Sequence, residues 1–179
     1  MSFGSLIGKR IVVTGSSTGI GAAIARECAV AGADVVVSYR TSESDAERVA
    51  DEVRSVGQSA DVVAVDLADD QSCEAFVQTC CDTGPVDAVI NNAGADLLTG
   101  AMKEADYFTK LQTLLDVDVR GTIRLSRAFG EVMLKQGHGC LLTVGWDQSD
   151  RGMEGDSGEL FAAAKNAVMG FSRSLSLTL

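Results

Sequence analysis

A glycine-rich run, Thr14-Gly15-Ser16-Ser17-Thr18-Gly19-Ile20-Gly21, constrains this chain more than any other feature. It follows the apolar segment Arg10–Val13 and opens a segment with helical patterning, Ile20–Val30. Glycines in such a turn let the backbone bend sharply and approach a pyrophosphate. The helix that follows presents free N–H groups and the positive end of its dipole to the phosphates. Three glycines alone would often only make a turn, but this context predicts a dinucleotide site.

Short apolar runs alternate with helical patterns along the chain. The runs are rich in Val, Ile and Leu, as strands buried on both faces are, and comprise Ile11–Thr14, Asp34–Tyr39, Asp61–Asp66, Ala88–Asn91 and Cys140–Gly145. The helical patterns are Ile20–Ala31, Glu43–Val56, Gln71–Cys81, Ala105–Gln136 and Gly158 to the end. This order predicts an α/β fold in three layers, a doubly wound parallel (Rossmann-like) sheet with strand order 3-2-1-4-5.

Bulk properties limit the class of protein. The 179 residues suit one domain, 1–179. The net charge of -10 argues against a nucleic-acid partner, which needs a basic face. No apolar run of about 18 residues could span a membrane, and Met1-Ser2-Phe3-Gly4 lacks the features of a signal peptide. Five cysteines without C-x-x-C spacing indicate reduced thiols, no metal site and a cytoplasmic protein.

The end of the chain reads as unfinished helix. The stretch Phe171–Leu179 contains no Gly, Asn or Pro to end the helix. We interpret this as a domain truncated at its C-terminus; the alternative is natural termination with frayed residues. The polar stretch Trp146–Gly158 is expected to be a mobile loop.

Four motifs, in this order along the chain, resemble the short-chain dehydrogenase/reductase family and within it the 3-oxoacyl-ACP reductases. They are the glycine pattern of Thr14–Gly21, Asp66-Leu67, Asn91-Asn92-Ala93-Gly94 and Lys165. The resemblance runs from about Lys9 to Leu179. It implies hydride transfer between NAD(H) or NADP(H) and a small-molecule carbonyl or alcohol substrate.

The expected cofactor-binding residues lie in the glycine-rich loop, at three strand ends and in the last helix. They are Gly15, Ser17, Thr18, Gly19, Ile20, Gly21, Tyr39, Arg40, Asp66, Leu67, Asn92, Ala93, Gly94 and Lys165. The carboxylate of Asp66 can accept from the adenine amino group while Leu67 covers the ring; alternatively, Asp66 caps the next helix. Asn91 is expected to fix the fourth strand.

The end of the second strand bears on the choice of cofactor. An acidic residue there would accept from the ribose hydroxyls and repel a 2′-phosphate. This chain has Arg40, whose planar guanidinium suits phosphate, with hydroxyl donors on Ser17, Thr41 and Ser42. NADP(H) is therefore expected over NAD(H); the alternative is that Arg40 is a solvated surface cation.

The positions that would carry the family's reaction are changed. The resemblance aligns its Tyr-x-x-x-Lys with Phe161-x-x-x-Lys165, its serine with Gly145 or Trp146, and its asparagine with Asp118. In the family the tyrosine protonates the substrate oxygen, and the lysine holds the nicotinamide ribose and lowers the phenol pKa. Of these positions only Lys165 is retained, although a solvated surface lysine remains the alternative. Losing a positioned general acid typically costs about 10²–10⁴ in rate.

We therefore expect weak or absent carbonyl reduction. Asp118, Asp147 or Lys165 could instead supply the proton through water, and Ser149 or Ser157 could orient a carbonyl. The alternative is a non-catalytic nucleotide-binding relative that acts as a sensor or as a structural subunit of an active partner. A third interpretation is a truncated product without stable function.

Two long helices bear on assembly. Ala105–Gln136 and Gly158–Leu179 correspond to helices that pair between subunits in the family, which predicts a homo-oligomer or a heteromer with a paralogue. The alternative is that their apolar residues only face the sheet.

Overall fold

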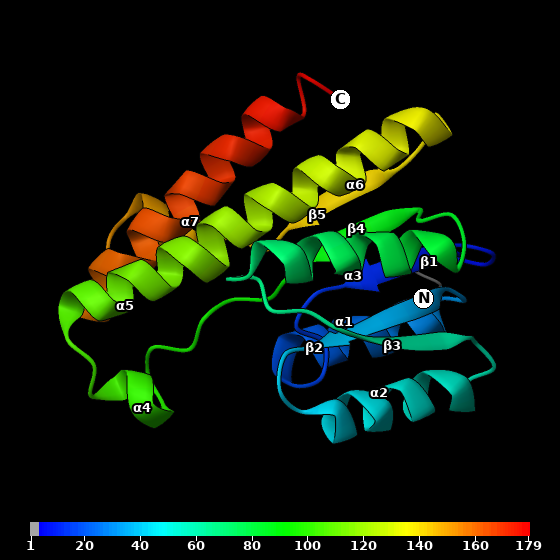
Figure 1. Ribbon diagram of the computed structural model, residues 1–179, viewed down its shortest axis with the longest axis horizontal. Helices are drawn as coiled ribbons and strands as arrows, with labels where there is room; N and C mark the ends of the chain where they lie inside the picture. Colours follow the sequence, from blue (N-terminus) through cyan, green and yellow to red (C-terminus); the bar gives the residue numbers. More distant parts are fainter. Residues whose placement is uncertain (1–3) are drawn as a thin grey trace.

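The computed structural model describes residues 4–179 (Figure 1). Residues 1–3, which belong to the N-terminal stretch without signal-peptide features, lie outside that range. The strands are β1 (Arg10–Val13), β2 (Asp34–Tyr39), β3 (Ala60–Ala64), β4 (Ala88–Asn91) and β5 (Cys140–Thr143). They form one parallel sheet in the order β3-β2-β1-β4-β5, which confirms the predicted topology.

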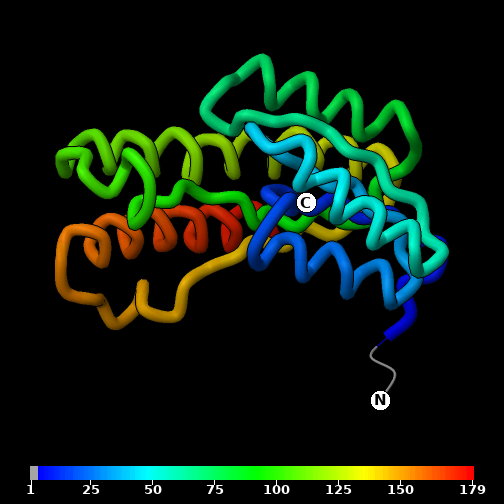
Figure 2. Tube along the Cα trace, turned by 90° about the horizontal axis from the view of Figure 1, so that it is seen from below, coloured from blue at the N-terminus to red at the C-terminus, as the bar shows by residue number. Residues whose placement is uncertain are grey.

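Helices cover both faces of the sheet, giving the predicted three layers (Figure 1). They are α1 (Gly19–Val30), α2 (Glu43–Ser55), α3 (Asp70–Asp82), α4 (Gly100–Lys103), α5 (Tyr107–Leu114), α6 (Thr122–Gln136) and α7 (Asp156–Leu175). Figure 2 shows α7, orange to red, running beside the long green α5–α6 helix. No helix in residues 4–179 is both long and apolar enough to cross a membrane.

Successive side chains of each central strand point to opposite faces of the sheet and pack into two separate hydrophobic cores. Val12 of β1 packs with Phe76 of α3 and Phe129 of α6, whose rings meet edge-on with centroids 6.2 Å apart. Val13, the next residue along β1, packs on the opposite face with the small and branched residues of α1 and α2, such as Val49. Burial on both faces explains why the strands read as continuous apolar runs.

The predicted helix Ala105–Gln136 is one rod with two departures. It begins at Tyr107, because the Asp106 carboxylate caps it by accepting from the backbone N–H groups of Phe108 and Thr109 at 3.0 and 3.1 Å. Its middle, Leu115–Gly121, is π-helical. A π-helical turn inserts an extra residue into the helical repeat and often marks a functional position.

The prediction that the last helix runs to the end of the chain is wrong. The helix α7 ends at Leu175. Beyond it the backbone N–H of Leu177 donates to Ser174 and that of Thr178 to Leu175, at 3.2 and 2.9 Å. These shorter-range bonds tighten the final turn and satisfy carbonyls that a helix end leaves free.

Two short elements were not predicted. The helix α4 follows the long connection after β4 and stands apart from the sheet (Figure 1). The stretch expected to be a mobile loop contains a 3₁₀ helix, Asp147–Asp150. Within it Ser149 is buried: its hydroxyl donates to the Trp146 carbonyl at 2.6 Å, and its carbonyl accepts from the Asn166 side chain at 2.8 Å. Ser149 is therefore committed to this turn rather than free to orient a carbonyl.

Candidate functional site

The glycine-rich loop is fixed to the ends of β2 and β4. The Thr14 hydroxyl accepts from the backbone N–H groups of Asn92 and Ala93, each at 3.0 Å. The Asn92 amide returns two bonds, to the carbonyls of Thr14 and Gly15 at 3.0 and 3.2 Å. On the other side, the Gly15 N–H donates to the Ser38 hydroxyl at 2.9 Å. The loop is thereby held rigid before any ligand arrives.

Two glycines of this loop are required by space. A Cβ on Gly15 would stand 2.9 Å from the Ala93 Cα, and the positive φ of 64° would strain any other residue. A Cβ on Gly21 would stand 2.3 Å from the Gly15 carbonyl oxygen and 2.5 Å from the Asn92 amide nitrogen. Gly19 also has a positive φ, 57°, but nothing lies within 4 Å of its missing Cβ. The loop is crowded where it packs and open at its tip.

The N-terminus of α1 has backbone N–H groups without a capping partner. Its N-cap residue, Thr18, makes no side-chain capping bond. Thr18, Gly19 and Ile20 are all exposed. The first N–H groups of a twelve-residue helix, together with its dipole, are therefore available to an anion.

A cleft of about 710 Å³ opens beside this loop. Most of the residues predicted to bind the cofactor line it, namely Gly15, Ser17, Thr18, Tyr39, Arg40, Asp66, Leu67, Asn92, Ala93 and Gly94. Gly19, Ile20, Gly21 and Lys165 do not line it. Gly21 instead allows the close packing beneath the loop.

Sequence reasoning missed the wall of the cleft made by α4, α5 and the connection that precedes α4. That wall includes Asp96, Thr99, Gly100, Ala101, Met102 and Thr113. Asp96 folds the connection by accepting from the backbone N–H groups of Leu98 and Thr99 at 2.8 and 3.2 Å. The spacing of an Asp three residues before a Thr was the available signal for this turn.

Arg40 lies exposed at the rim of the cleft. Among the salt bridges of residues 4–179, none involves this guanidinium. Ser17 and Thr41 also line the cleft. Ser42 is less available than expected, since its hydroxyl donates to Asp45 at 2.6 Å. This bond and the Arg48 guanidinium hold the pKa of Asp45 below its ordinary value.

The capping alternative for Asp66 is wrong. The residue that caps α3 is Asp69, which accepts from the backbone N–H of Ser72 at 2.8 Å. Asp66 lines the cleft and turns the chain by accepting from the Ala68 N–H at 3.0 Å. Its other carboxylate oxygen makes no bond within the described residues, so it keeps an acceptor for a ligand.

Asn91 fixes β4, as expected. It is buried, and its amide donates to the Ser126 hydroxyl of α6 at 2.9 Å.

Asp118, in the π-helical segment, meets Lys165 of α7. The Lys165 ammonium nitrogen lies 3.2 Å from the Asp118 Oδ2 atom, within ion-pair distance but without hydrogen-bond geometry. The other carboxylate oxygen, Oδ1, accepts from the Ala95 N–H at 2.7 Å. Asp118 thus connects α7 to the segment that follows β4. No sequence signal specified this pairing.

Trp146, one of the two residues expected to align with the family's serine, contacts Phe161, the residue expected to align with its tyrosine. The rings of Trp146 and Phe161 meet edge-on, with centroids 6.2 Å apart and planes at 66°. Phe161 also packs against the apolar cluster that contains Leu114 and Leu160. Gly145 is exposed and lies next to Met169. No hydroxyl stands on any of these three residues.

Four of the five cysteines are unfavourable as nucleophiles. Burial raises the pKa of the Cys80 thiol to about 12, and burial also raises that of Cys28, Cys73 and Cys81. Such thiols stay protonated and unreactive. Within residues 4–179 no three His, Cys, Asp or Glu residues gather in a group that could hold a metal ion.

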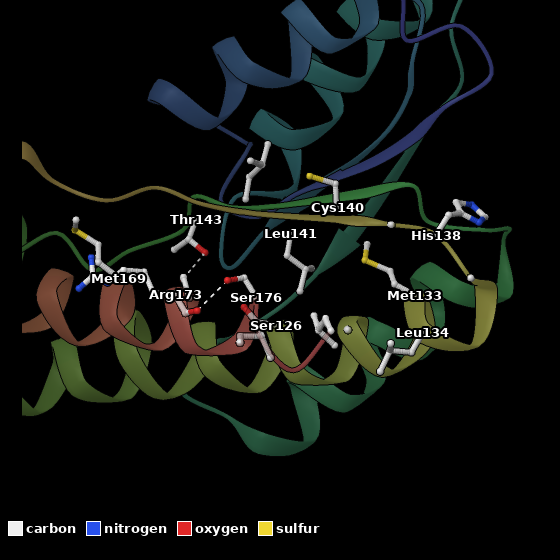
Figure 3. Close-up of a pocket in the computed structure, with 17 residues that line it drawn as sticks. Ser126, Met133, Leu134, His138, Cys140, Leu141, Thr143, Met169, Arg173 and Ser176 are labelled. Atoms are coloured by element: carbon white, nitrogen blue, oxygen red, sulfur yellow. Dashed lines mark hydrogen bonds between the residues drawn. The ribbon is translucent and has the colours of Figure 1, made fainter.

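A second hollow, of about 730 Å³, lies between β5, α6 and α7 (Figure 3). It runs along the edge strand, and none of the predicted site residues lines it. The Ser172 hydroxyl of α7 donates to that of Thr143 at 3.2 Å across its floor. The candidate site is therefore the cleft beside the glycine loop.

Comparison with known proteins agrees with the topology and the motifs. The family model described as short chain dehydrogenase matches residues 9–179. The 3-oxoacyl-[acyl-carrier-protein] reductase FabG of Escherichia coli is 34% identical over 172 residues, which cover 94% of this chain and 66% of that protein.

Two solved structures from Burkholderia cenocepacia share the fold. A short chain dehydrogenase in complex with NADP has a TM-score of 0.84 and 32% identity, covering 97% of this chain and 69% of that one. A gluconate 5-dehydrogenase in complex with NADP and tartrate has a TM-score of 0.84 and 27% identity, covering 97% and 67%.

The chain thus spans about two thirds of the length of its relatives, 66% for the Escherichia coli reductase. The match nevertheless includes every element described above, from the glycine loop to α7. The chain belongs to the short chain dehydrogenase family, whose members are oxidoreductases that use nicotinamide cofactors.

Proposed function

We propose that this chain binds NADP(H) in the cleft beside the glycine loop and has little or no ordinary carbonyl reductase activity. The observation that carries the proposal is the contrast between a cleft lined by ten of the predicted cofactor residues and the Trp146–Phe161 contact, which has no hydroxyl where the resemblance places the family's tyrosine and serine. By analogy with the reductases it resembles, any residual substrate is a 3-oxoacyl thioester or a similar small carbonyl compound.

The residues present fit a dinucleotide. Gly15 and Gly21 make a turn that a Cβ would fill, and the N-terminus of α1 offers unused donors to a pyrophosphate. Asp66 and Leu67 border the part of the cleft assigned to the adenine. Asn92 to Gly94 provide the wall assigned to the nicotinamide side.

The preference for NADP(H) rests on Arg40. The structure leaves this guanidinium exposed at the cleft rim, without a salt bridge in the described chain. A 2′-phosphate would give it a bidentate partner. NADP in relatives' structures supports the same choice.

Reduction of a carbonyl also needs a proton. NADPH, when bound, supplies a hydride, and the proton then has to come from a group at the substrate oxygen. Phe161 has no proton to give, and its ring is packed against Trp146 and the Leu114 cluster. The two tyrosines do not replace it: Tyr39 stands at the end of β2, and the Tyr107 hydroxyl donates to Glu159 at 3.1 Å.

The same contact supports a non-catalytic role, as a nucleotide sensor or as the structural subunit of an active paralogue. Exposed apolar residues on the α5–α6 rod, Phe108 (74% exposed) and Leu115 (38%), suit a partner helix from a second copy or a paralogue. The single-domain organisation, the truncation and the cytoplasmic location stay predictions.

Titration of the purified protein with NADPH and NADH, followed by NADPH oxidation with a 3-oxoacyl thioester, tests both parts. We expect tighter binding of NADPH than NADH and negligible oxidation. Equal affinities would contradict the role of Arg40. Robust oxidation would contradict the loss of activity.

A further inference from the structure

Asp118 is a charged residue buried inside the protein. Its side chain is only 1% exposed, and that of Lys165 is 16% exposed. Among the salt bridges of residues 4–179, Lys165 supplies the sole cation for this carboxylate. A carboxylate removed from water is strongly unfavourable unless a counter-ion and hydrogen bonds replace its hydration.

The surroundings of Asp118 leave no substitute for Lys165. Oδ1 is satisfied by the Ala95 N–H at 2.7 Å, but Oδ2 has no hydrogen bond. Oδ2 also lies 2.9 Å from the place where a Cβ on Gly94 would stand, so the carboxylate fits closely against that backbone. Without the ammonium, Oδ2 would be a buried negative charge with no partner.

The pair joins three parts of the chain. Asp118 comes from the π-helical segment, Lys165 from α7, and Gly94 and Ala95 from the connection after β4. Gly94 and Ala95 line the nucleotide cleft, whereas Lys165 does not. The pair therefore acts on the cleft through the Ala95 bond.

We infer that Lys165 is retained as the counter-ion of Asp118, and that Asp118 uses this pairing to position the Gly94–Ala95 wall of the cleft. Both are positioning residues. A neutral side chain at position 118 would not need the ammonium, so the two residues depend on each other. This requirement holds whether or not hydride is transferred.

A double-mutant cycle in thermal unfolding tests the dependence. Lys165→Met strands the buried carboxylate, and we expect the Tm to fall by roughly 6–20 °C. In the Asp118→Asn background, whose amide oxygen still accepts from Ala95, Lys165→Met should change the Tm by no more than about 2 °C. Lys135→Met, which removes an exposed lysine from α6, is the matched control and should have no effect.

The double-mutant cycle can also contradict the inference. Equal losses from Lys165→Met in both backgrounds would overturn the inference. If Lys165→Met alone yields no folded protein, recovery of folded protein with Asp118→Asn/Lys165→Met supports it, and failure of both variants contradicts it. These measurements need no nucleotide, so they are independent of the proposed function.

Two further readouts separate positioning from general stabilisation. Amide exchange at Ala95 should accelerate in Lys165→Met and return to the wild-type rate when Asp118→Asn is added. NADPH affinity, which rests on the proposed function, should fall several-fold in Lys165→Met and recover in the double variant. A loss of affinity that Asp118→Asn does not rescue would show that Lys165 contacts the nucleotide directly and would contradict the positioning role.

Discussion

The glycine loop and the corner formed by Trp146 and Phe161 are built by different means. The loop relies on backbone: its carbonyls at Thr14 and Gly15 accept from the Asn92 amide, its Gly15 N–H donates to Ser38, and the helix that follows keeps free donors. The corner relies on side chains: two aromatic rings meet edge-on, and neither carries a hydroxyl.

This difference determines which substitutions phosphate binding and proton transfer can each tolerate. Backbone recognition of phosphates survives many side-chain changes as long as the turn keeps its glycines. Proton transfer depends on one acidic hydrogen at one place, so a single substitution removes it. A family member that loses selection for chemistry would keep the first kind of site longer than the second.

The largest effect is expected from filling the loop. Gly21→Ala places a Cβ within 2.3 Å of the Gly15 carbonyl oxygen and 2.5 Å of the Asn92 amide. The crowding displaces the groups that hold the loop, and we expect a loss of NADPH affinity of about 100-fold, equivalent to about 2.7 kcal/mol, with a loss of stability of about 1–3 kcal/mol. Calorimetric titration and urea unfolding measure the two.

Gly170→Ala is the control for that change. Nothing lies within 4 Å of its missing Cβ, and it sits inside α7. It should leave NADPH affinity unchanged and raise stability by about 0.5–1 kcal/mol. Unchanged NADPH affinity in Gly21→Ala would show that this loop does not form the nucleotide site.

The next effect concerns the choice between the two cofactors. Arg40→Gln removes the cation at the cleft rim, and a hydrogen bond to a charged group contributes about 1.5–3 kcal/mol. We expect NADPH affinity to fall by about 10- to 100-fold and NADH affinity to stay the same. Arg173→Gln, an exposed arginine beside the second hollow, should change neither. If the affinities for NADPH and NADH fell equally, Arg40 would not be the residue that binds the 2′-phosphate.

A smaller effect is expected at the aromatic corner. The edge-on contact of Trp146 and Phe161 should contribute about 0.5–1.5 kcal/mol beyond area burial. A cycle of Trp146→Leu, Phe161→Leu and both, followed by urea unfolding, isolates that coupling. If the losses in the free energy of unfolding were additive, the two rings would stabilise the fold independently of each other.

The sequence was sufficient for the sheet, and ten of the fourteen residues predicted to bind the cofactor line the cleft. Strands such as Asp34–Tyr39 and Ala88–Asn91 were predicted with their observed bounds, because strands buried on both faces leave unbroken apolar runs. Gly15 carries its signal locally, in a turn between a strand and a helix, and Asn92 carries its signal directly after the apolar run of β4.

Features that depend on tertiary packing could not be predicted from the sequence. The π-helical segment Leu115–Gly121 lies inside a stretch predicted as one continuous helix, and the extra residue in its middle was not predicted. The four-residue helix α4 is too short to show a period. The pairing of Asp118 with Lys165 joins residues 47 positions apart and becomes visible only when α7 packs on the rod.

The last prediction concerns a change that should achieve almost nothing. Phe161→Tyr adds a hydroxyl, yet its ring stays packed edge-on against Trp146, and neither Gly145 nor Trp146 carries a hydroxyl to assist it. Lys165, which in the family lowers the phenol pKa, lies beside Asp118, whose negative charge offsets that effect. NADPH oxidation with a 3-oxoacyl thioester should therefore remain near the wild-type rate.

Adding Gly145→Ser or Trp146→Ser to Phe161→Tyr separates the missing acid from the missing helper. Each double variant supplies a hydroxyl at one of the two positions that align with the family's serine, and replacing Trp146 also removes the ring that packs against position 161. If Phe161→Tyr alone raises the rate by about 10²-fold or more, the magnitude of one positioned general acid, then the reaction end lacks only a proton. In that case one hydroxyl at position 161 is enough for activity, and no change at Gly145 or Trp146 is needed.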